Sequence, residues 1–123
     1  MILVDSSGWI EFVTAGSLGS EYRSLLLGKE SIVTPTIVVY EVYKALSRLD
    51  PRLAEEAVGA MRRTRIVPLT EPLALRSARV SRERRLAMAD AILYATAEAE
   101  GAELATSDAH FKGLPGVRYL VKK

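Results

Sequence analysis

The chain has 123 residues, the usual size of one compact domain, so we expect a single domain over residues 1–123. Its 49% hydrophobic and 26% charged residues exclude a disordered chain, and the absence of cysteine excludes disulfides, thiolate metal sites and cysteine nucleophiles. The net charge of +2 is too small to require a polyanionic partner, and the lack of a signal-like or membrane-spanning stretch predicts a cytoplasmic protein with no membrane partner.

Five short apolar runs predict strands, and longer helical patterns separate most of them. Short and nearly continuous apolar runs are typical of buried parallel strands, and the helices between them supply the crossover connections that parallel strands need. The pattern predicts an α/β domain in which helices flank a mostly parallel sheet of about five strands. The expected strands cover residues 2–4, 31–34, 65–68, 103–106 and 117–121.

Six helices are expected between these strands, and capping residues mark several of their ends. Thr36 is the expected N-cap of the third helix, Asp50-Pro51 ends that helix and starts the fourth, and Gly101 stops the last. The expected ranges are 7–13, 20–27, 36–49, 51–63, 71–85 and 88–100.

An aspartate follows each of two expected strands. Asp5 comes directly after the first strand, and Asp108 lies just beyond the strand at 103–106. Ligands of parallel α/β sheets bind outside the carboxyl ends of the strands, and Mg²⁺ takes carboxylate and water oxygens, so two such acids can hold a cation. The alternative for each aspartate is a cap for the helix or turn that follows it.

Two further acids lie within expected helices. Glu41 has apolar neighbours one turn away on either side and lies near the buried stripe, although a solvated edge position is the alternative. Asp90 lies in the first turn of an almost wholly apolar helix, where its interaction with the helix N-terminus is a sufficient structural explanation. Neither residue indicates a site by itself.

Together and in order, these four acids and their neighbours resemble the PIN-domain ribonucleases of the VapC toxin type. The resemblance covers the whole chain and rests on the segments VDSSGWIEF, TPTIVVYEV, MADAILYATA and ATSDAHF. It implies a three-layer α/β/α fold and endonucleolytic cleavage of RNA with Mg²⁺ or Mn²⁺. It also implies a cognate antitoxin and a homodimer.

The resemblance further implies an acidic site with two supporting hydroxyls. We expect Asp5 and Asp108 to bind the metal, Asp90 to bind it directly or through water, and Glu41 to orient or deprotonate the attacking water. The position after Asp108 is Ala109, so a fifth acid found in some relatives is absent, and we expect one firmly held metal and a second that binds only with substrate. The expected supporting hydroxyls are those of Ser6 and Thr106.

The basic residues are concentrated in one segment. Residues 62–85 carry eight arginines and two glutamates, a net charge of +6, and the rest of the chain carries −4. Arg82, Arg84 and Arg85 are predicted to hold RNA phosphates, with a solvated helix face as the alternative. His110, the only histidine, is interpreted as a structural hydrogen-bonding residue rather than an acid for the leaving oxygen.

Three other functions are alternatives to a toxin nuclease. A receiver domain should have an acid after the third strand, where this chain has Pro68-Leu69-Thr70. A catalytically silent PIN module that binds RNA or protein would be favoured by the loss of an acid, and none is lost. A PIN nuclease that acts in RNA processing remains an alternative to the toxin.

Four apolar residues of the first two helices are expected in the core, with a partner surface as the alternative: Trp9, Phe12, Tyr22 and Leu26.

Overall fold

Five parallel strands form the central sheet of the structure, a computed structural model that describes residues 1–122. The strands lie in the order β3-β2-β1-β4-β5, and every pairing among them is parallel. The expected mostly parallel, five-stranded sheet is confirmed. The strands are β1 (Ile2–Val4), β2 (Ile32–Pro35), β3 (Arg65–Val67), β4 (Glu103–Thr106) and β5 (Val117–Tyr119).

The six expected helices are present in residues 1–122, and their ends lie within one residue of the expected positions. A short 3₁₀ helix, η1, is the only helical element there that we did not expect. The helices are α1 (Ser6–Thr14), α2 (Gly19–Leu26), α3 (Thr36–Leu49), α4 (Pro51–Arg62), α5 (Glu71–Arg84), α6 (Met88–Glu100) and η1 (Ala109–Phe111).

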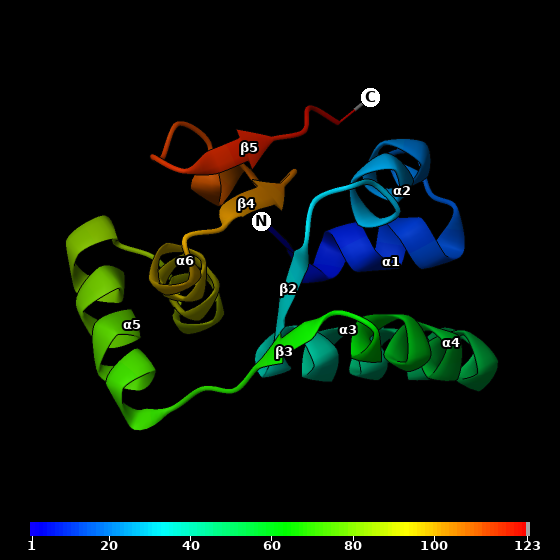
Figure 1. The fold of residues 1–123 in the computed structure, drawn as a ribbon, viewed down its shortest axis with the longest axis horizontal. Coiled ribbons are helices and arrows are strands. Elements are labelled where there is room, and N and C mark those ends of the chain that lie inside the picture. The colour runs from blue at the N-terminus through cyan, green and yellow to red at the C-terminus, as the bar shows by residue number, and fades with distance from the viewer. Residues whose placement is uncertain (123) are drawn as a thin grey trace.

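The helices cover the two faces of the sheet unequally, with α1 to α4 on one face and α5 and α6 on the other (Figure 1). The chain moves from β1 through β2 to β3 in one direction and then returns past β1 to β4. Right-handed crossovers in opposite directions place their helices on opposite faces, which gives the expected α/β/α layers. The direction changes between β1 and β4, and ligand sites of open α/β sheets form at the carboxyl ends of such strands.

The start of α1 packs tightly against the sheet and α2. Trp9 is 2% exposed and Tyr22 is fully buried, while Phe12 and Leu26 pack against the same core. A Cβ atom on Gly8 would lie 2.5 Å from Cε1 of Tyr22, so only glycine permits this close approach. The core interpretation of the four apolar residues therefore holds.

The helix caps agree with the sequence except at one position. Asp50 accepts a hydrogen bond from the amide of Arg52 at 2.9 Å, and Gly101 ends α6 in a left-handed conformation with φ of 66°. The prediction that Thr36 is an N-cap was wrong, because Pro35 holds the extended cap conformation and Thr36 is already helical. Among residues 1–122, no helix is long and apolar enough to cross a membrane.

Candidate functional site

Asp5 lies at the carboxyl end of β1 and is 4% exposed. Its carboxylate accepts hydrogen bonds from Oγ1 of Thr106 at 2.6 Å and from the amide of Gly8 at 2.8 Å. The hydroxyl of Ser7 donates to the same carboxylate at 3.1 to 3.2 Å. Asp5 is therefore the N-cap of α1, as the structural interpretation predicted, and it lies at the carboxyl end of β1, where the functional interpretation expects a ligand site.

The environment of Asp5 disfavours its negative charge. Burial raises the pKa of Asp5 above its ordinary value, and the nearby charge of Asp108 raises it further. The hydrogen bonds from Thr106, Gly8 and Ser7 lower the pKa but do not offset burial. A cation beside this carboxylate would relieve the cost of holding it ionised.

Thr106 connects Asp5 to Asp108. This residue is fully buried, and its hydroxyl donates to Asp5 while it accepts a hydrogen bond from the amide of Asp108 at 3.0 Å. Asp108 in turn accepts a hydrogen bond from the amide of His110 at 2.9 Å, which caps η1. One hydroxyl at the end of β4 thus fixes the positions of the two strand-end aspartates.

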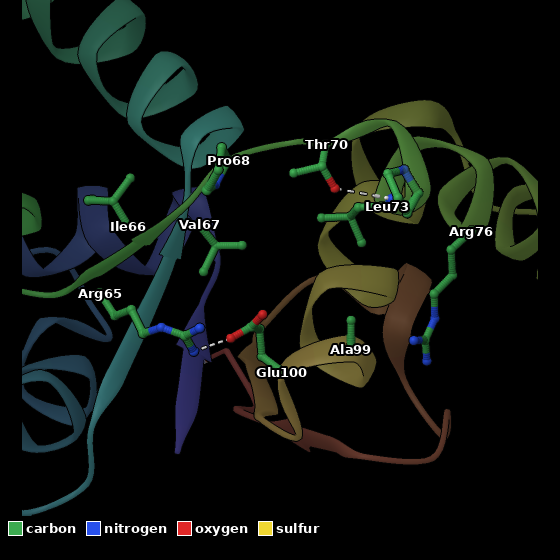
Figure 2. A pocket seen from close by; sticks show the side chains of 10 residues that line it. Arg65, Ile66, Val67, Pro68, Thr70, Leu73, Arg76, Ala99 and Glu100 are labelled. Carbon is green, nitrogen blue, oxygen red and sulfur yellow. Dashed lines mark hydrogen bonds and ion pairs between the residues drawn. The ribbon is translucent and has the colours of Figure 1, made fainter.

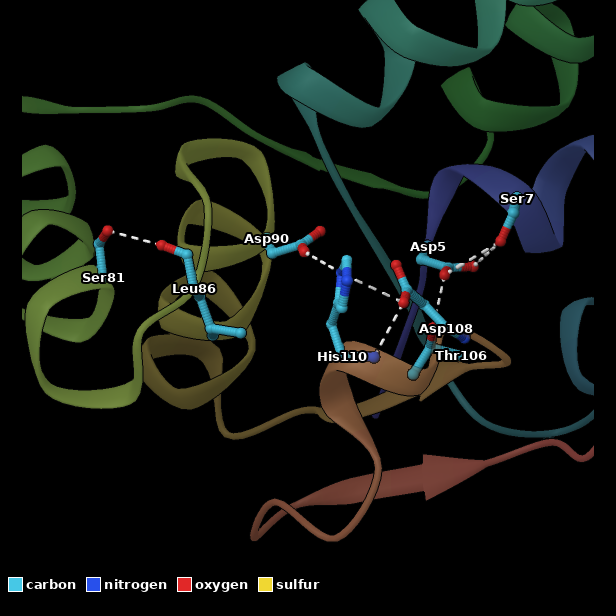
Figure 3. Close-up of polar contacts among 8 residues, drawn as sticks. All are labelled: Asp5, Ser7, Ser81, Leu86, Asp90, Thr106, Asp108 and His110. Carbon is cyan, nitrogen blue, oxygen red and sulfur yellow. Dashed lines mark hydrogen bonds and ion pairs between the residues drawn. The ribbon is translucent and has the colours of Figure 1, made fainter.

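The structure brings His110 between Asp90 and Asp108, and Figure 3 shows the three side chains following one another across the site. Nδ1 of His110 lies 3.1 Å from Oδ2 of Asp90 and 3.4 Å from Oδ1 of Asp108. Among residues 1–122, these three side chains form a group with ligand atoms within 4.8 Å of one another, as a bound metal ion requires. His110 was not among the residues that we expected at the site.

Glu41 reaches the site from α3 through Ser6. The hydroxyl of Ser6, the first residue of α1, donates a hydrogen bond to Oε1 of Glu41. Glu41 is half-buried and lies outside the group formed by Asp90, Asp108 and His110. Ser6 directly follows Asp5 in the chain. Its hydrogen bond to Glu41 therefore holds the carboxylate of Glu41 near the carboxyl end of β1, where Asp5 lies.

The three arginines proposed as phosphate contacts lie at the end of α5, and all are exposed. The guanidinium of Arg84 lies 5.0 Å from the ring centre of Tyr94, which is one helical turn beyond Asp90 in α6. Arg85 ends α5 with a φ of 55°, and the hydroxyl of Ser81 donates to the carbonyl of Leu86 at 2.7 Å to close this turn (Figure 3). The turn brings positive charge close to the helix that carries Asp90.

The cavity shown in Figure 2 is separate from the acids. It has a volume of about 390 Å³, lies between β3 and the helices α5 and α6, and includes the ion pair between Arg65 and Glu100. Glu100 ends α6, and Asp90 lies ten residues earlier, which is roughly 15 Å along a helix. We therefore assign the candidate site to the acids and not to this cavity.

Comparison with known proteins gives a family and a set of similar folds. The family model of the PIN domain matches residues 2–117, and no curated protein was found to match the chain. A toxin–antitoxin complex from Klebsiella pneumoniae has a TM-score of 0.87 at 22% identity, with full coverage of both chains. VapC20 from Mycobacterium tuberculosis, described as a sarcin–ricin loop cleaving toxin, has a TM-score of 0.77 at 23% identity, again over both full chains. DNA-bound VapBC from Salmonella typhimurium has a TM-score of 0.73 at 16% identity, covering 97% of this chain and 96% of that chain.

Proposed function

The chain belongs to the PIN-domain family, and on this premise we propose that it is a metal-dependent endoribonuclease that acts as the toxin of a toxin–antitoxin pair. The proposal rests on two observations: Thr106 bonds both Asp5 and the amide of Asp108, and a carboxylate oxygen of Asp108 lies within 4.8 Å of one of Asp90. Acids from separate parts of the sequence are thus gathered near the carboxyl ends of β1 and β4. This edge is where the chain changes direction across the sheet, the usual place for a ligand site in such folds.

The residues present suit a divalent cation. Carboxylate oxygens are the ligands that Mg²⁺ and Mn²⁺ prefer, and Asp90 and Asp108 are half-buried, so they are open to an ion and its waters. Burial raises the pKa of Asp5 and the charge of Asp108 adds to the rise, so a cation beside these carboxylates would favour their ionised forms. We assign Asp5, Asp90 and Asp108 to the cation.

The remaining residues have roles around that cation, which when bound activates water and stabilises negative charge on the phosphate. Glu41 orients or deprotonates the attacking water, and the hydrogen bond from Ser6 fixes its carboxylate for this role. Thr106 holds Asp5 and Asp108 at a constant separation. Arg82, Arg84 and Arg85 contact phosphates of the RNA backbone beside the site, which positions the strand without reading its sequence.

The proposed partners follow from the structurally similar proteins. One of these is a toxin–antitoxin complex, and another is described as cleaving the sarcin–ricin loop. By analogy, we assign to this chain an RNA substrate, a cognate protein antitoxin and a homodimeric state. Light scattering of the purified chain, alone and with the antitoxin, tests the two protein partners.

Cleavage of RNA by matched variants tests the function. We expect Asp5→Asn to abolish cleavage and Glu41→Gln to slow it by roughly a hundredfold or more, the usual contribution of a general base. Glu56→Gln, which alters an exposed acid of α4, is the control and should cleave normally. EDTA should stop the wild-type reaction. Activity that resists EDTA, or that survives in Asp5→Asn, would contradict the proposed function.

A further inference from the structure

We propose that His110 is a nitrogen ligand of the divalent cation, together with Asp90 and Asp108, and that it shifts the ion preference of the site from Mg²⁺ towards Mn²⁺. The inference rests on the proposed metal-dependent function, and it adds a residue to the site that the acidic motif does not contain. It is carried by the geometry around the imidazole, by the way its backbone is held and by the chemistry of the ligand.

The ligand atoms have the spacing that a bound cation needs. In octahedral coordination with bonds of about 2.1 Å, adjacent ligand atoms lie about 3.0 Å apart. Nδ1 of His110 lies 3.1 Å from Oδ2 of Asp90 and 3.4 Å from Oδ1 of Asp108. Both distances are thus close to those between neighbouring ligand atoms of one cation.

The backbone holds His110 in place beside the acids. Its amide donates to the carboxylate of Asp108, and the next residue, Phe111, is 1% exposed and anchors η1 in the core. The side chain of His110 is itself 71% exposed, and the contacts described for its ring in residues 1–122 are those to Asp90 and Asp108. The ring is therefore positioned by its backbone and is not part of a buried structural network.

The chemistry of imidazole as a ligand determines which ion the site prefers. Carboxylates alone are a donor set that Mg²⁺ accepts, whereas an imidazole nitrogen favours transition-metal ions over Mg²⁺. Adding His110 to Asp90 and Asp108 gives a mixed oxygen and nitrogen set. Such a set should bind Mn²⁺ more tightly than Mg²⁺.

Pulsed electron paramagnetic resonance of Mn²⁺ bound to the untagged protein tests the inference directly. Because His110 is the only histidine in the chain, imidazole coupling can come from this residue alone. We expect ¹⁴N modulation in the wild type, its replacement by ¹⁵N coupling after labelling with ¹⁵N-histidine, and its loss in His110→Ala. Lys112→Ala, an exposed change in the same segment, is the control and should keep the modulation.

The same samples give the ion preference by calorimetry. His110→Ala should weaken Mn²⁺ binding by roughly tenfold or more and weaken Mg²⁺ binding less, since even outer partners of metal ligands contribute ten- to a hundredfold. Bound Mn²⁺ without nitrogen coupling would overturn the inference while leaving the proposed function intact, and failure to bind Mn²⁺ would overturn it as well. Nitrogen-coupled Mn²⁺ in a protein that cleaves no RNA would support the ligand assignment and contradict the proposed function.

Discussion

Replacing Thr106 with valine should destabilise the protein, and the cost should be larger at pH 8 than at pH 4. The hydroxyl of Thr106 donates to Asp5 at 2.6 Å and accepts from the amide of Asp108 at 3.0 Å, in a fully buried position. Valine keeps the shape of threonine, so the substitution removes both hydrogen bonds and leaves the packing nearly unchanged.

The expected magnitude depends on the charge of Asp5. A hydrogen bond to an ionised group contributes about 1.5 to 3 kcal/mol to stability, and one between neutral groups about 0.5 to 1.5 kcal/mol. The Thr106 hydroxyl lowers the pKa of Asp5, which burial holds above the ordinary 3.8, so the valine variant has a still higher folded pKa. Because the folded pKa of Asp5 lies above 3.8 and is higher still in the variant, the carboxyl is protonated to a larger extent at pH 4 than at pH 8, and most so in the variant. As the pH rises through the folded pKa, the variant must ionise Asp5 without this donor and loses more stability.

Urea unfolding in EDTA at pH 4 and pH 8 measures this difference. Because two hydrogen bonds are lost, we expect Thr106→Val to cost about 2 to 4.5 kcal/mol at pH 8 and about 1 to 3 kcal/mol at pH 4. The control is Thr34→Val, because Thr34 is equally buried and its hydroxyl bonds to that of Thr64 at 2.6 Å, with no carboxylate involved. Its cost should be the same at both pH values. An equal cost for Thr106→Val at both values would refute the view that Thr106 acts on an ionised Asp5.

Three other predictions concern the arginines and the cation. Replacing Arg82, Arg84 and Arg85 with alanine should make RNA binding less sensitive to salt. The slope of log binding constant against log salt concentration should fall by roughly 0.7 to 0.9 per lost phosphate contact. An unchanged slope would show that these arginines are solvated and do not contact phosphates. Arg85→Gly should raise the melting temperature, because a φ of 55° costs a non-glycine residue about 1 kcal/mol, and should still weaken RNA binding. A variant that melts lower would show that the Arg85 side chain stabilises the turn. In thermal melts, Mn²⁺ at a hundredfold excess over Kd should stabilise the wild type by about 2.7 kcal/mol and Asp90→Asn by less. If Mn²⁺ stabilises both proteins equally, Asp90 interacts only with the N-terminus of α6 and does not bind the cation.

Much of the fold could be predicted because local signals and packing agree. The apolar runs are short enough to be buried strands, and residues such as Asp50 and Gly101 mark helix ends through their own hydrogen bonding and backbone freedom. Thr36 was misplaced by one position, since a proline in the extended conformation took the cap. The strand order needs packing across the sheet, which a linear pattern does not contain.

The candidate site could be predicted only in part for a related reason. Asp5 follows β1 directly and Asp108 lies two residues after the end of β4, so their place at the carboxyl ends of these strands could be inferred from sequence. His110 could not, because its position depends on η1, a single turn with no apolar period, which brings the imidazole to Asp90 from twenty residues later in the chain. One signal for His110 was present in the sequence. It lies two residues after Asp108, the spacing at which an aspartate accepts a hydrogen bond from the backbone amide of the turn that follows it.

The central claim is that these acids direct cation-assisted attack of water on an RNA phosphodiester, and analysis of the product ends tests it most directly. Attack by water leaves linear phosphate and hydroxyl ends and does not need the 2′-hydroxyl next to the cleaved bond. We predict that a substrate with a single 2′-deoxy substitution at that position is still cut in Mn²⁺ and that no 2′,3′-cyclic phosphate forms. Asp5→Asn should cut neither the RNA nor the deoxy-substituted substrate. A cyclic phosphate end, or complete resistance of the deoxy substrate, would contradict the account.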